Sequence, residues 1–179
     1  MPELPEVEIV KRSLKNKVNN KKIKKIIITN RNLRFKIEKN FEKLLEGSQI
    51  TKVSRFSKYI ILNLNNFRYC LIHLGMSGTL HLINDKKENQ ITNLSFYSSK
   101  ILPKKHNHVK IKFSNFMLIY NDPRRFGFFK ILYNKKELKK YFQKSGPEAN
   151  SSKFNFKYVK DKIINKKKNI KNCLLDQTF

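Results

Sequence analysis

Residues 50–83 read ITKVSRFSKYIILNLNNFRYCLIHLGMSGTLHLI, and the pattern of this stretch is the main indication of the fold class. It contains short segments rich in β-branched and aromatic residues, separated by polar or glycine-containing turns, which is the pattern of consecutive strands. The predicted strands are Ile50–Phe56, Tyr59–Leu64, Phe67–Leu74 and Thr79–Ile83. Short strands at this density favour an antiparallel sandwich or barrel.

The same pattern continues on both sides of this stretch. Further strands are predicted at Lys22–Thr29, His108–Phe113, Phe116–Tyr120 and Phe128–Leu132. The apolar residues of 4–18 recur at helical spacing, a short helix is expected at Lys39–Leu45, and Asn84–Ser99 reads as a polar, irregular loop. From residue 135 the chain becomes helical and lysine-rich. We therefore predict an α+β fold: an N-terminal antiparallel β-sandwich flanked by helices over residues 1–134, and the start of a helical domain over 135–179.

The composition points to a polyanionic partner. The chain has 40 Lys and Arg against 13 Asp and Glu, a formal net charge of +27, and such a charge predicts salt-dependent binding of nucleic acid. Lys, Asn and Ile are abundant throughout, as in proteins from AT-rich genomes, so the charge does not identify the type of nucleic acid.

Two separated cysteines, Cys70 and Cys173, favour free thiols and a reduced intracellular setting. There is no signal-peptide h-region and no apolar run of about 18 residues, so we expect neither secretion nor a membrane span.

The chain start carries a candidate nucleophile. It reads Met-Pro-Glu-Leu-Pro-Glu-Val-Glu, and removal of Met1 would leave Pro2 as a secondary amine. An α-amino group has a pKa of about 7.7–8.0, so part of it is uncharged and nucleophilic at neutral pH. Attack on a sugar carbon would give an iminium ion. The alternative is an ordinary helix start, because proline and acidic residues both favour the first helical turn. The two interpretations are compatible.

Several short motifs together resemble one enzyme family. They are Pro-Glu-Leu-Pro-Glu-Val-Glu at 2–8, Ser-Lys-Tyr at 57–59, His-Leu-Gly-Met-Ser-Gly at 73–78, Lys-His-Asn-His-Val at 105–109 and Asp-Pro-Arg-Arg-Phe-Gly at 122–127. In this order and roughly this spacing they resemble the formamidopyrimidine-DNA glycosylases, bacterial base-excision enzymes for oxidised purines. The resemblance runs over essentially the whole chain. The related endonuclease VIII enzymes have Gly where this chain has Leu4.

The resemblance implies a role for each catalytic candidate. Pro2 would attack the deoxyribose C1′, and Glu3 would manage the proton at the ring oxygen. Glu6 would steady the charged intermediate or orient the nucleophile. Lys58, expected at the tip of a tight hairpin, matches an essential lysine that contacts the damaged base or a flanking phosphate. A solvated turn residue is the alternative for Lys58. The resulting β- and δ-eliminations need no metal.

The resemblance also implies DNA contacts. Met76, Arg124 and Phe126 match a triad that fills the space left by an extruded nucleotide. The alternative for Met76 and Phe126 is core packing, although glycines and charged residues beside them favour loop tips. Residues matching or lying near family phosphate contacts are Arg34, His73, His106, His108 and Lys171. For each of these, a solvated charge or a core histidine is the alternative. Asn107 stands where the family usually has Asp.

The end of the chain departs from the family. Family members continue into a second half of a helix–two-turn–helix module and a C-terminal zinc finger, so we expect that something normally follows residue 179 and that this chain binds no cofactor itself. The expected partner is double-stranded DNA containing oxidised purines or abasic sites, and the expected protein is a monomer of the bacterial cytoplasm, associated with the nucleoid. Two rival hypotheses are a catalytically weak damaged-DNA-binding module and a basic β-protein that binds RNA or ribosomes.

Overall fold

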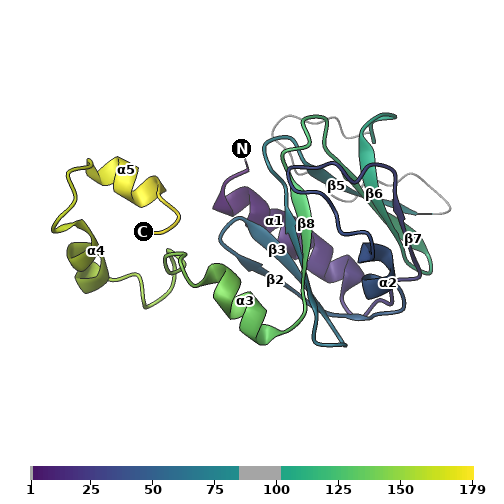
Figure 1. Ribbon diagram of the computed structural model, residues 1–179, viewed down its shortest axis with the longest axis horizontal. Coiled ribbons are helices and arrows are strands. Elements are labelled where there is room, and N and C mark those ends of the chain that lie inside the picture. The colour runs from purple at the N-terminus through teal and green to yellow at the C-terminus, as the bar shows by residue number, and fades with distance from the viewer. Residues whose placement is uncertain (1, 85–101) are drawn as a thin grey trace. The chain divides into compact units, whose positions relative to one another are not determined.

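The computed structural model describes residues 2–84 and 102–179, so the predicted loop at 84–99 lies outside the described residues from residue 85 onward. The chain forms two compact units, Met1–Lys135 and Lys136–Phe179. In chain order the elements are α1 (Leu4–Val18), β1 (Lys25–Ile28), α2 (Phe41–Leu45), β2 (Ile50–Phe56), β3 (Tyr59–Leu64), β4 (Tyr69–His73), β5 (Thr79–Asn84), β6 (Asn107–Lys112), β7 (Phe116–Asn121), β8 (Phe128–Leu132), α3 (Lys135–Phe142), α4 (Phe156–Ile163) and α5 (Ile170–Leu175) (Figure 1).

In the described part of the first unit, eight strands form two four-stranded antiparallel sheets. One has the order β1-β6-β7-β5 and the other β2-β3-β4-β8. Apolar side chains from both sheets, such as Ile111 and Leu118 of the first and Leu62 and Ile72 of the second, belong to one buried core. The predicted α+β class, with an antiparallel sandwich and flanking helices, is confirmed.

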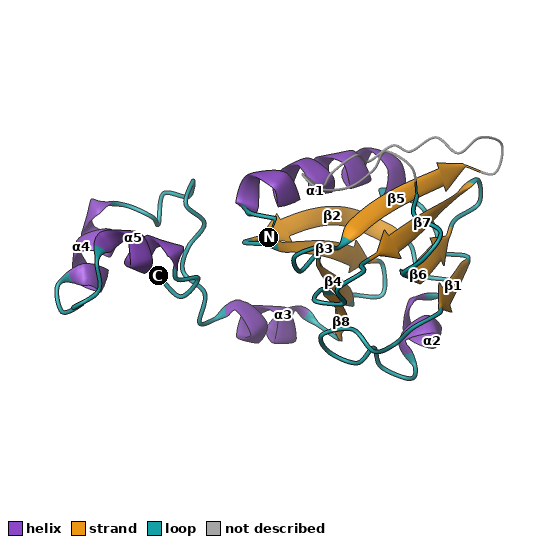
Figure 2. Cartoon of the chain, turned by 90° about the horizontal axis from the view of Figure 1, so that it is seen from above, coloured by secondary structure: helices purple, strands orange, loops and turns teal. Residues whose placement is uncertain are grey.

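Helix α1 forms where the sequence predicts it and closes one side of this core. Its residues Val7, Val10, Leu14 and Val18 are buried, as expected for an apolar stripe at 3.6-residue spacing. The helix packs mainly against β2, and Figure 2 shows it running along that sheet. Beyond its last turn, the side-chain oxygen of Asn19 accepts a hydrogen bond from Val53 N at 3.0 Å. This contact fixes α1 to β2, the strand that leads into the predicted active-site hairpin.

The second unit is helical. The side-chain oxygens of Asn155 and Asn169 cap α4 and α5 by accepting from Tyr158 N at 3.0 Å and Asn172 N at 2.9 Å. These caps are the helix-start chemistry expected of asparagine. Over residues 2–84 and 102–179 no helix is long and apolar enough to cross a membrane. The identification of this unit as an incomplete helix–two-turn–helix domain stays a prediction.

Candidate active site

The structure brings the chain start and the β2–β3 turn together. Phe56 and Tyr59 are paired across a two-residue turn, which places Lys58 at the hairpin tip as predicted. Lys58 Nζ lies 2.7 Å from Glu3 Oε2, and its side chain is only 16% exposed. Glu3 N–H in turn donates to Glu6 Oε2 at 2.9 Å. Glu3, Glu6 and Lys58 are therefore connected by direct contacts, beside Pro2.

The local backbone explains why these groups meet. Glu3 is the N-cap residue of α1 and Glu6 is its third helical residue, so the Glu6 carboxylate reaches back to the N–H of Glu3. Ser57 adopts a positive φ of 48°, which lets the hairpin turn tightly before Lys58. Pro2 precedes the helix and is partly exposed. The arrangement leaves a partly exposed chain start next to two carboxylates and an ammonium group.

A second ion-pair network, whose members were not among the predicted site residues, holds the hairpin against α1. Arg55 Nε lies 2.9 Å from Glu8 Oε2, and Arg55 Nη1 donates to Ser57 O at 2.8 Å. Burial works against the Glu8 charge, but hydrogen bonds from Lys11, Arg55 and Arg12 lower the Glu8 pKa to about 2. Glu8 is therefore ionised at neutral pH. The sequence could have indicated part of this network, because Lys11 and Arg12 lie three and four residues after Glu8 in a predicted helix, the spacing of helical ion pairs.

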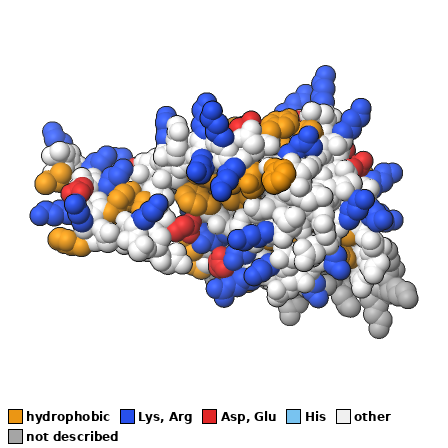
Figure 3. All heavy atoms as spheres, turned by 90° about the horizontal axis from the view of Figure 1, so that it is seen from below, with side chains coloured by type: hydrophobic (Ala, Val, Ile, Leu, Met, Phe, Trp, Pro, Cys, Tyr) orange, Lys and Arg blue, Asp and Glu red, His pale blue; other side chains and the backbone are white. Residues whose placement is uncertain are grey.

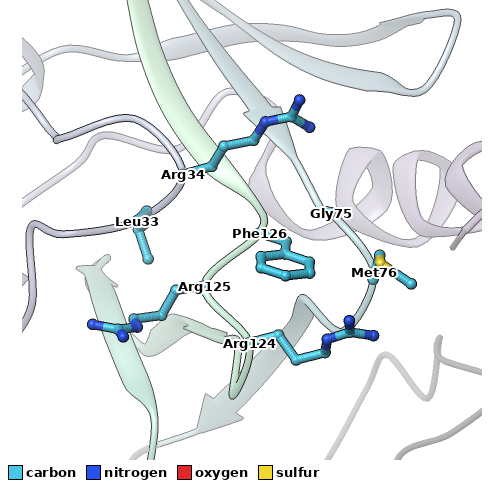
Figure 4. A pocket seen from close by; sticks show the side chains of 7 residues that line it. All are labelled: Leu33, Arg34, Gly75, Met76, Arg124, Arg125 and Phe126. Atoms are coloured by element: carbon cyan, nitrogen blue, oxygen red, sulfur yellow. The ribbon is translucent and has the colours of Figure 1, made fainter.

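The predicted wedge residues lie on two neighbouring loops. Met76 follows β4 and is 41% exposed, and Phe126 precedes β8 and is 42% exposed, so the alternative of core packing is wrong for both. The Arg124 guanidinium carbon lies 4.6 Å from the centre of the Phe126 ring, within cation–π range. These three residues, with Leu33, Arg34, Gly75 and Arg125, line one pocket, and Figure 4 shows Phe126 lying between Arg34, Met76, Arg124 and Arg125.

Backbone contacts explain the proximity of these loops. Gly75 has a φ of +65°, and a Cβ on it would overlap the backbone of Phe126 and Gly127. Only glycine permits both the conformation and the close approach. Arg34 N donates to Gly127 O at 3.2 Å, so a third segment joins the same place. The predicted contact residue Arg34 thus lies beside the wedge residues although it is distant from them in sequence.

The histidines differ in their surroundings. His73 is buried, and its Nδ1 accepts a hydrogen bond from Gly75 N at 3.0 Å. Burial, together with the charges of Arg34 and Lys58, lowers the His73 pKa to about 4, so the ring is neutral at pH 7. His108 is also buried and donates its Nε2–H to Asp122 O at 2.8 Å, whereas His106 is exposed. Phosphate contact by each stays a prediction, and for His73 and His108 the observed partners are inside the protein.

Asn107, the departure from the family pattern, has local partners. Its Nδ2 donates to Pro103 O at 2.8 Å, and its Oδ1 accepts from Asn121 Nδ2 at 2.8 Å. The amide thus uses both its donor and its acceptor, which a carboxylate cannot do. Lys171 is exposed on α5 in the second unit.

Electrostatics favour an anion at this molecule's surface. Lys and Arg side chains are scattered over the whole face shown in Figure 3, with fewer acidic side chains among them. Within residues 2–84 and 102–179, no group of three or more His, Cys, Asp or Glu side chains is placed to hold a metal ion. The predicted absence of a cofactor stays a prediction.

Comparison with known proteins identifies the family. The family model of the formamidopyrimidine-DNA glycosylase N-terminal domain matches residues 1–129. The chain belongs to the formamidopyrimidine-DNA glycosylase family. A formamidopyrimidine-DNA glycosylase of Wolbachia pipientis subsp. Culex pipiens is 41% identical over 177 residues, covering 98% of this chain and 60% of the relative. One from Rickettsia bellii is 37% identical over 177 residues, again covering 98% and 60%.

Solved structures of this family agree with the fold. The Lactococcus lactis glycosylase bound non-covalently to DNA containing an abasic site matches with a TM-score of 0.83 and 30% identity, covering 99% of this chain and 63% of that one. The same enzyme with a formamidopyrimidine-dG-containing DNA gives a TM-score of 0.83 at 31% identity, covering 98% and 62%. The chain thus spans about 60% of the length of the curated relatives it matches.

Proposed function

We propose that this chain carries the catalytic part of a bifunctional DNA glycosylase and abasic-site lyase that removes oxidised purines from double-stranded DNA. The observation that carries the proposal is the position of Glu3, which contacts Lys58 at 2.7 Å and Glu6 at 2.9 Å immediately after Pro2. A nucleophilic amine that attacks a sugar needs a nearby group that can accept and donate a proton. The Glu3 carboxylate, directly after Pro2, is such a group.

The chemistry begins at the sugar. The Pro2 nitrogen lone pair forms a bond to C1′, and the oxidised base leaves with the electrons of its glycosidic bond and takes up a proton. The Glu3 carboxylate takes up the proton that the Pro2 nitrogen loses and gives it to the ring oxygen as the C1′–O4′ bond breaks, so the ring opens and an iminium ion forms between Pro2 and C1′. Glu6 keeps the chain start oriented through its bond to Glu3 N–H.

Strand cleavage follows from the charge of the iminium ion. That charge acidifies the C2′ proton, and its removal sends the electron pair into a new double bond and expels the 3′ phosphate. A second elimination expels the 5′ phosphate, and hydrolysis of the remaining imine releases Pro2. Lys58, only partly exposed beside Glu3, is suited to contact the base or a flanking phosphate near this centre.

Base removal requires the nucleotide to leave the duplex. We assign Met76 and Phe126 as the wedge and Arg124 as the donor to the orphaned base, because all three project from neighbouring loops that line one pocket. Arg34, exposed beside them, supplies a cation for the phosphate backbone. His73, His106, His108 and Lys171 stay predicted contacts, and the monomeric, cytoplasmic and nucleoid-associated state also stays a prediction.

The substrate class is supported by the relatives. The Lactococcus lactis structures contain DNA with an abasic site or a formamidopyrimidine lesion, and the relatives are named formamidopyrimidine-DNA glycosylases. We extend this to 8-oxoguanine and formamidopyrimidines as substrates of the full protein.

Borohydride trapping tests the proposal. A duplex with one abasic site is incubated with the chain and sodium borohydride, which reduces an iminium to a stable amine. A covalent adduct is expected, and a chain whose start is blocked by a residue before Pro2 that is not removed is the control and should give none. Binding without an adduct would instead favour a damaged-DNA-binding module, and preference for RNA would favour the RNA-binding hypothesis.

A further inference from the structure

One buried carboxylate, that of Asp122, connects the two loops that carry the wedge residues. Asp122 is 0% exposed, and both of its side-chain oxygens accept hydrogen bonds. Oδ1 accepts from Ser77 Oγ at 2.5 Å. Oδ2 accepts from Gly127 N at 2.9 Å and from Tyr120 OH at 2.8 Å. Ser77 directly follows Met76 and Gly127 directly follows Phe126, so each wedge loop has a bond to the same carboxylate.

The backbone of Asp122 extends the connection. Its N–H donates to His106 O at 3.1 Å, and its carbonyl accepts from His108 Nε2 at 2.8 Å and Arg125 N at 3.2 Å. Ser77 Oγ also accepts from Arg124 N at 3.3 Å, so the Met76 loop touches the Arg124 loop directly as well. Asp122 is thus the meeting point of three of the sequence motifs, at 73–78, 105–109 and 122–127.

Because Asp122 is buried, its carboxylate depends on the protein for all of its hydrogen bonds. A carboxylate without solvent must have its lone pairs satisfied by the protein, and here two of the three donors, Ser77 Oγ and Gly127 N, come from the wedge loops and the third, Tyr120 OH, from β7. Burial and the neighbouring Asp122 raise the Tyr120 pKa well above its usual value, so the phenol keeps its proton and remains a donor. Separation of the loops would cost the buried carboxylate at least one of its hydrogen bonds.

We propose that Asp122 is a positioning residue that locks the two wedge loops together, so that Met76, Arg124 and Phe126 enter the duplex as one preorganised unit. The inference rests on the proposed function, because it concerns extrusion of the target nucleotide. Extruding a base from the duplex costs a few kcal/mol. Side chains that are already ordered lose less conformational entropy when they insert into the duplex, so they add less to this cost. Asp122 itself lies below the surface and touches no DNA in this scheme.

Three substitutions separate this role from simple packing. Asp122→Asn leaves one acceptor oxygen for three donors. Ser77→Ala removes the two hydrogen bonds of the Ser77 hydroxyl, to Asp122 and from Arg124 N, and keeps the carboxylate. Tyr120→Phe is the matched control, since it also deletes one hydrogen bond to Asp122 but none from a wedge loop.

The readout is base unstacking without chemistry. A duplex carries a tetrahydrofuran abasic analogue, which cannot be cleaved through an iminium, and 2-aminopurine beside it reports unstacking by fluorescence. We expect Ser77→Ala and Asp122→Asn to slow unstacking about ten-fold, as for loss of a hydrogen bond to a charged group. Tyr120→Phe should stay within about three-fold, because Gly127 N–H still reaches the carboxylate. Amide exchange at Arg124 and Gly127, measured without DNA, should rise in the first two variants.

The outcomes are distinct. If the unaltered protein unstacks the probe and Ser77→Ala does so at the same rate with unchanged amide exchange, the positioning role is overturned and the proposed function stands. If Tyr120→Phe is slowed as much as Ser77→Ala, the carboxylate supports general packing and the inference also fails. If the unaltered protein binds the duplex without unstacking it, the proposed function fails first, and the inference with it. If Asp122→Asn does not fold, the unstacking rate and the amide exchange of Ser77→Ala test the positioning role without it.

Discussion

Lys58 Nζ and Glu3 Oε2 lie 2.7 Å apart, and this ion pair joins the tip of the β2–β3 hairpin to the residue after Pro2. The site therefore contains two amines with different surroundings. Lys58 is paired with a carboxylate and mostly buried, whereas Pro2 is partly exposed at the start of the chain. The nitrogen of an ion-paired ammonium group has no free lone pair, so it is a poor nucleophile.

The covalent adduct should therefore be on Pro2. After borohydride trapping on an abasic-site duplex, digestion and mass spectrometry should place the DNA remnant on the N-terminal peptide, with Met1 removed. Lys58→Gln should still give the adduct on the same peptide, although more slowly. An adduct found on Lys58 alone in the unaltered protein would refute the assignment.

Glu3→Gln should abolish base removal and leave lesion binding within a few-fold. The amide keeps the shape of the side chain and still offers an oxygen to Lys58, but it cannot transfer a proton, which contributes about 10²–10⁴-fold in general acid–base catalysis. Single-turnover excision and a binding titration measure the two effects separately. Asp161→Asn, at an exposed carboxylate on α4, is the control. Near-normal excision by the Gln variant would exclude the proton-transfer role.

His73 should make stability fall as the pH drops from about 6.5 toward 4. Burial and nearby cations lower its pKa from 6.5 to about 4 in the folded state, so the unfolded chain binds the proton first. Unfolding by urea at pH 7 and pH 5 measures the change. His73→Asn keeps an acceptor for Gly75 N–H but has no proton to bind, so it should lose less stability between these pH values. Equal losses in both proteins would contradict a buried neutral ring.

Glu8→Gln should destabilise the first unit by about 1–2 kcal/mol at pH 7, as for loss of charge-assisted hydrogen bonds. The Glu8 pKa of about 2 lies below its ordinary value of 4.5, so the stabilisation is full above pH 4.5 and disappears as the pH falls toward 2. Urea unfolding should show a smaller difference between the two proteins at pH 3 than at pH 7. Arg12→Gln is the matched control, because Arg12 is 75% exposed and its pair with Glu8 adds little.

Local sequence signals predicted most of the secondary structure. The bounds of α1, β2, β3 and β8 agree with the sequence prediction, because apolar periodicity and flanking turn residues specify each one locally. The prediction was too long for β4, which begins at Tyr69 because Phe67 adopts a positive φ of 62° in a turn. It was also too long for β1, since Lys22 forms only an isolated bridge with Gln49.

The contacts between distant residues were beyond the sequence. Glu8 and Arg55 are 47 positions apart, and Ser77 and Asp122 are 45 apart, so only the fold shows that they meet. The burial of His73 likewise depends on the pairing of β4 with its neighbours, which places its ring against Phe128 at 5.3 Å. Motif resemblance identified the residues expected to contact DNA. Ser77 and Asp122 lie in the same motifs, but nothing in the sequence indicated that these two side chains contact each other.

The relatives contain a further part that this chain does not match, because the match covers 60% of their length. Each phosphate contact supplied by that part should steepen the log–log salt dependence of duplex binding by roughly 0.9. We expect this chain alone to bind weakly, to discriminate little between damaged and intact duplex, and to excise 8-oxoguanine slowly or not at all. Cleavage of a pre-formed abasic site should survive better, because that site is already partly unstacked and costs less to extrude. The measurement compares both activities and the salt slope for this chain and for a version extended after Phe179 by the corresponding part of a relative. Equal activity of the two proteins on both substrates would show that the first two units suffice for catalysis.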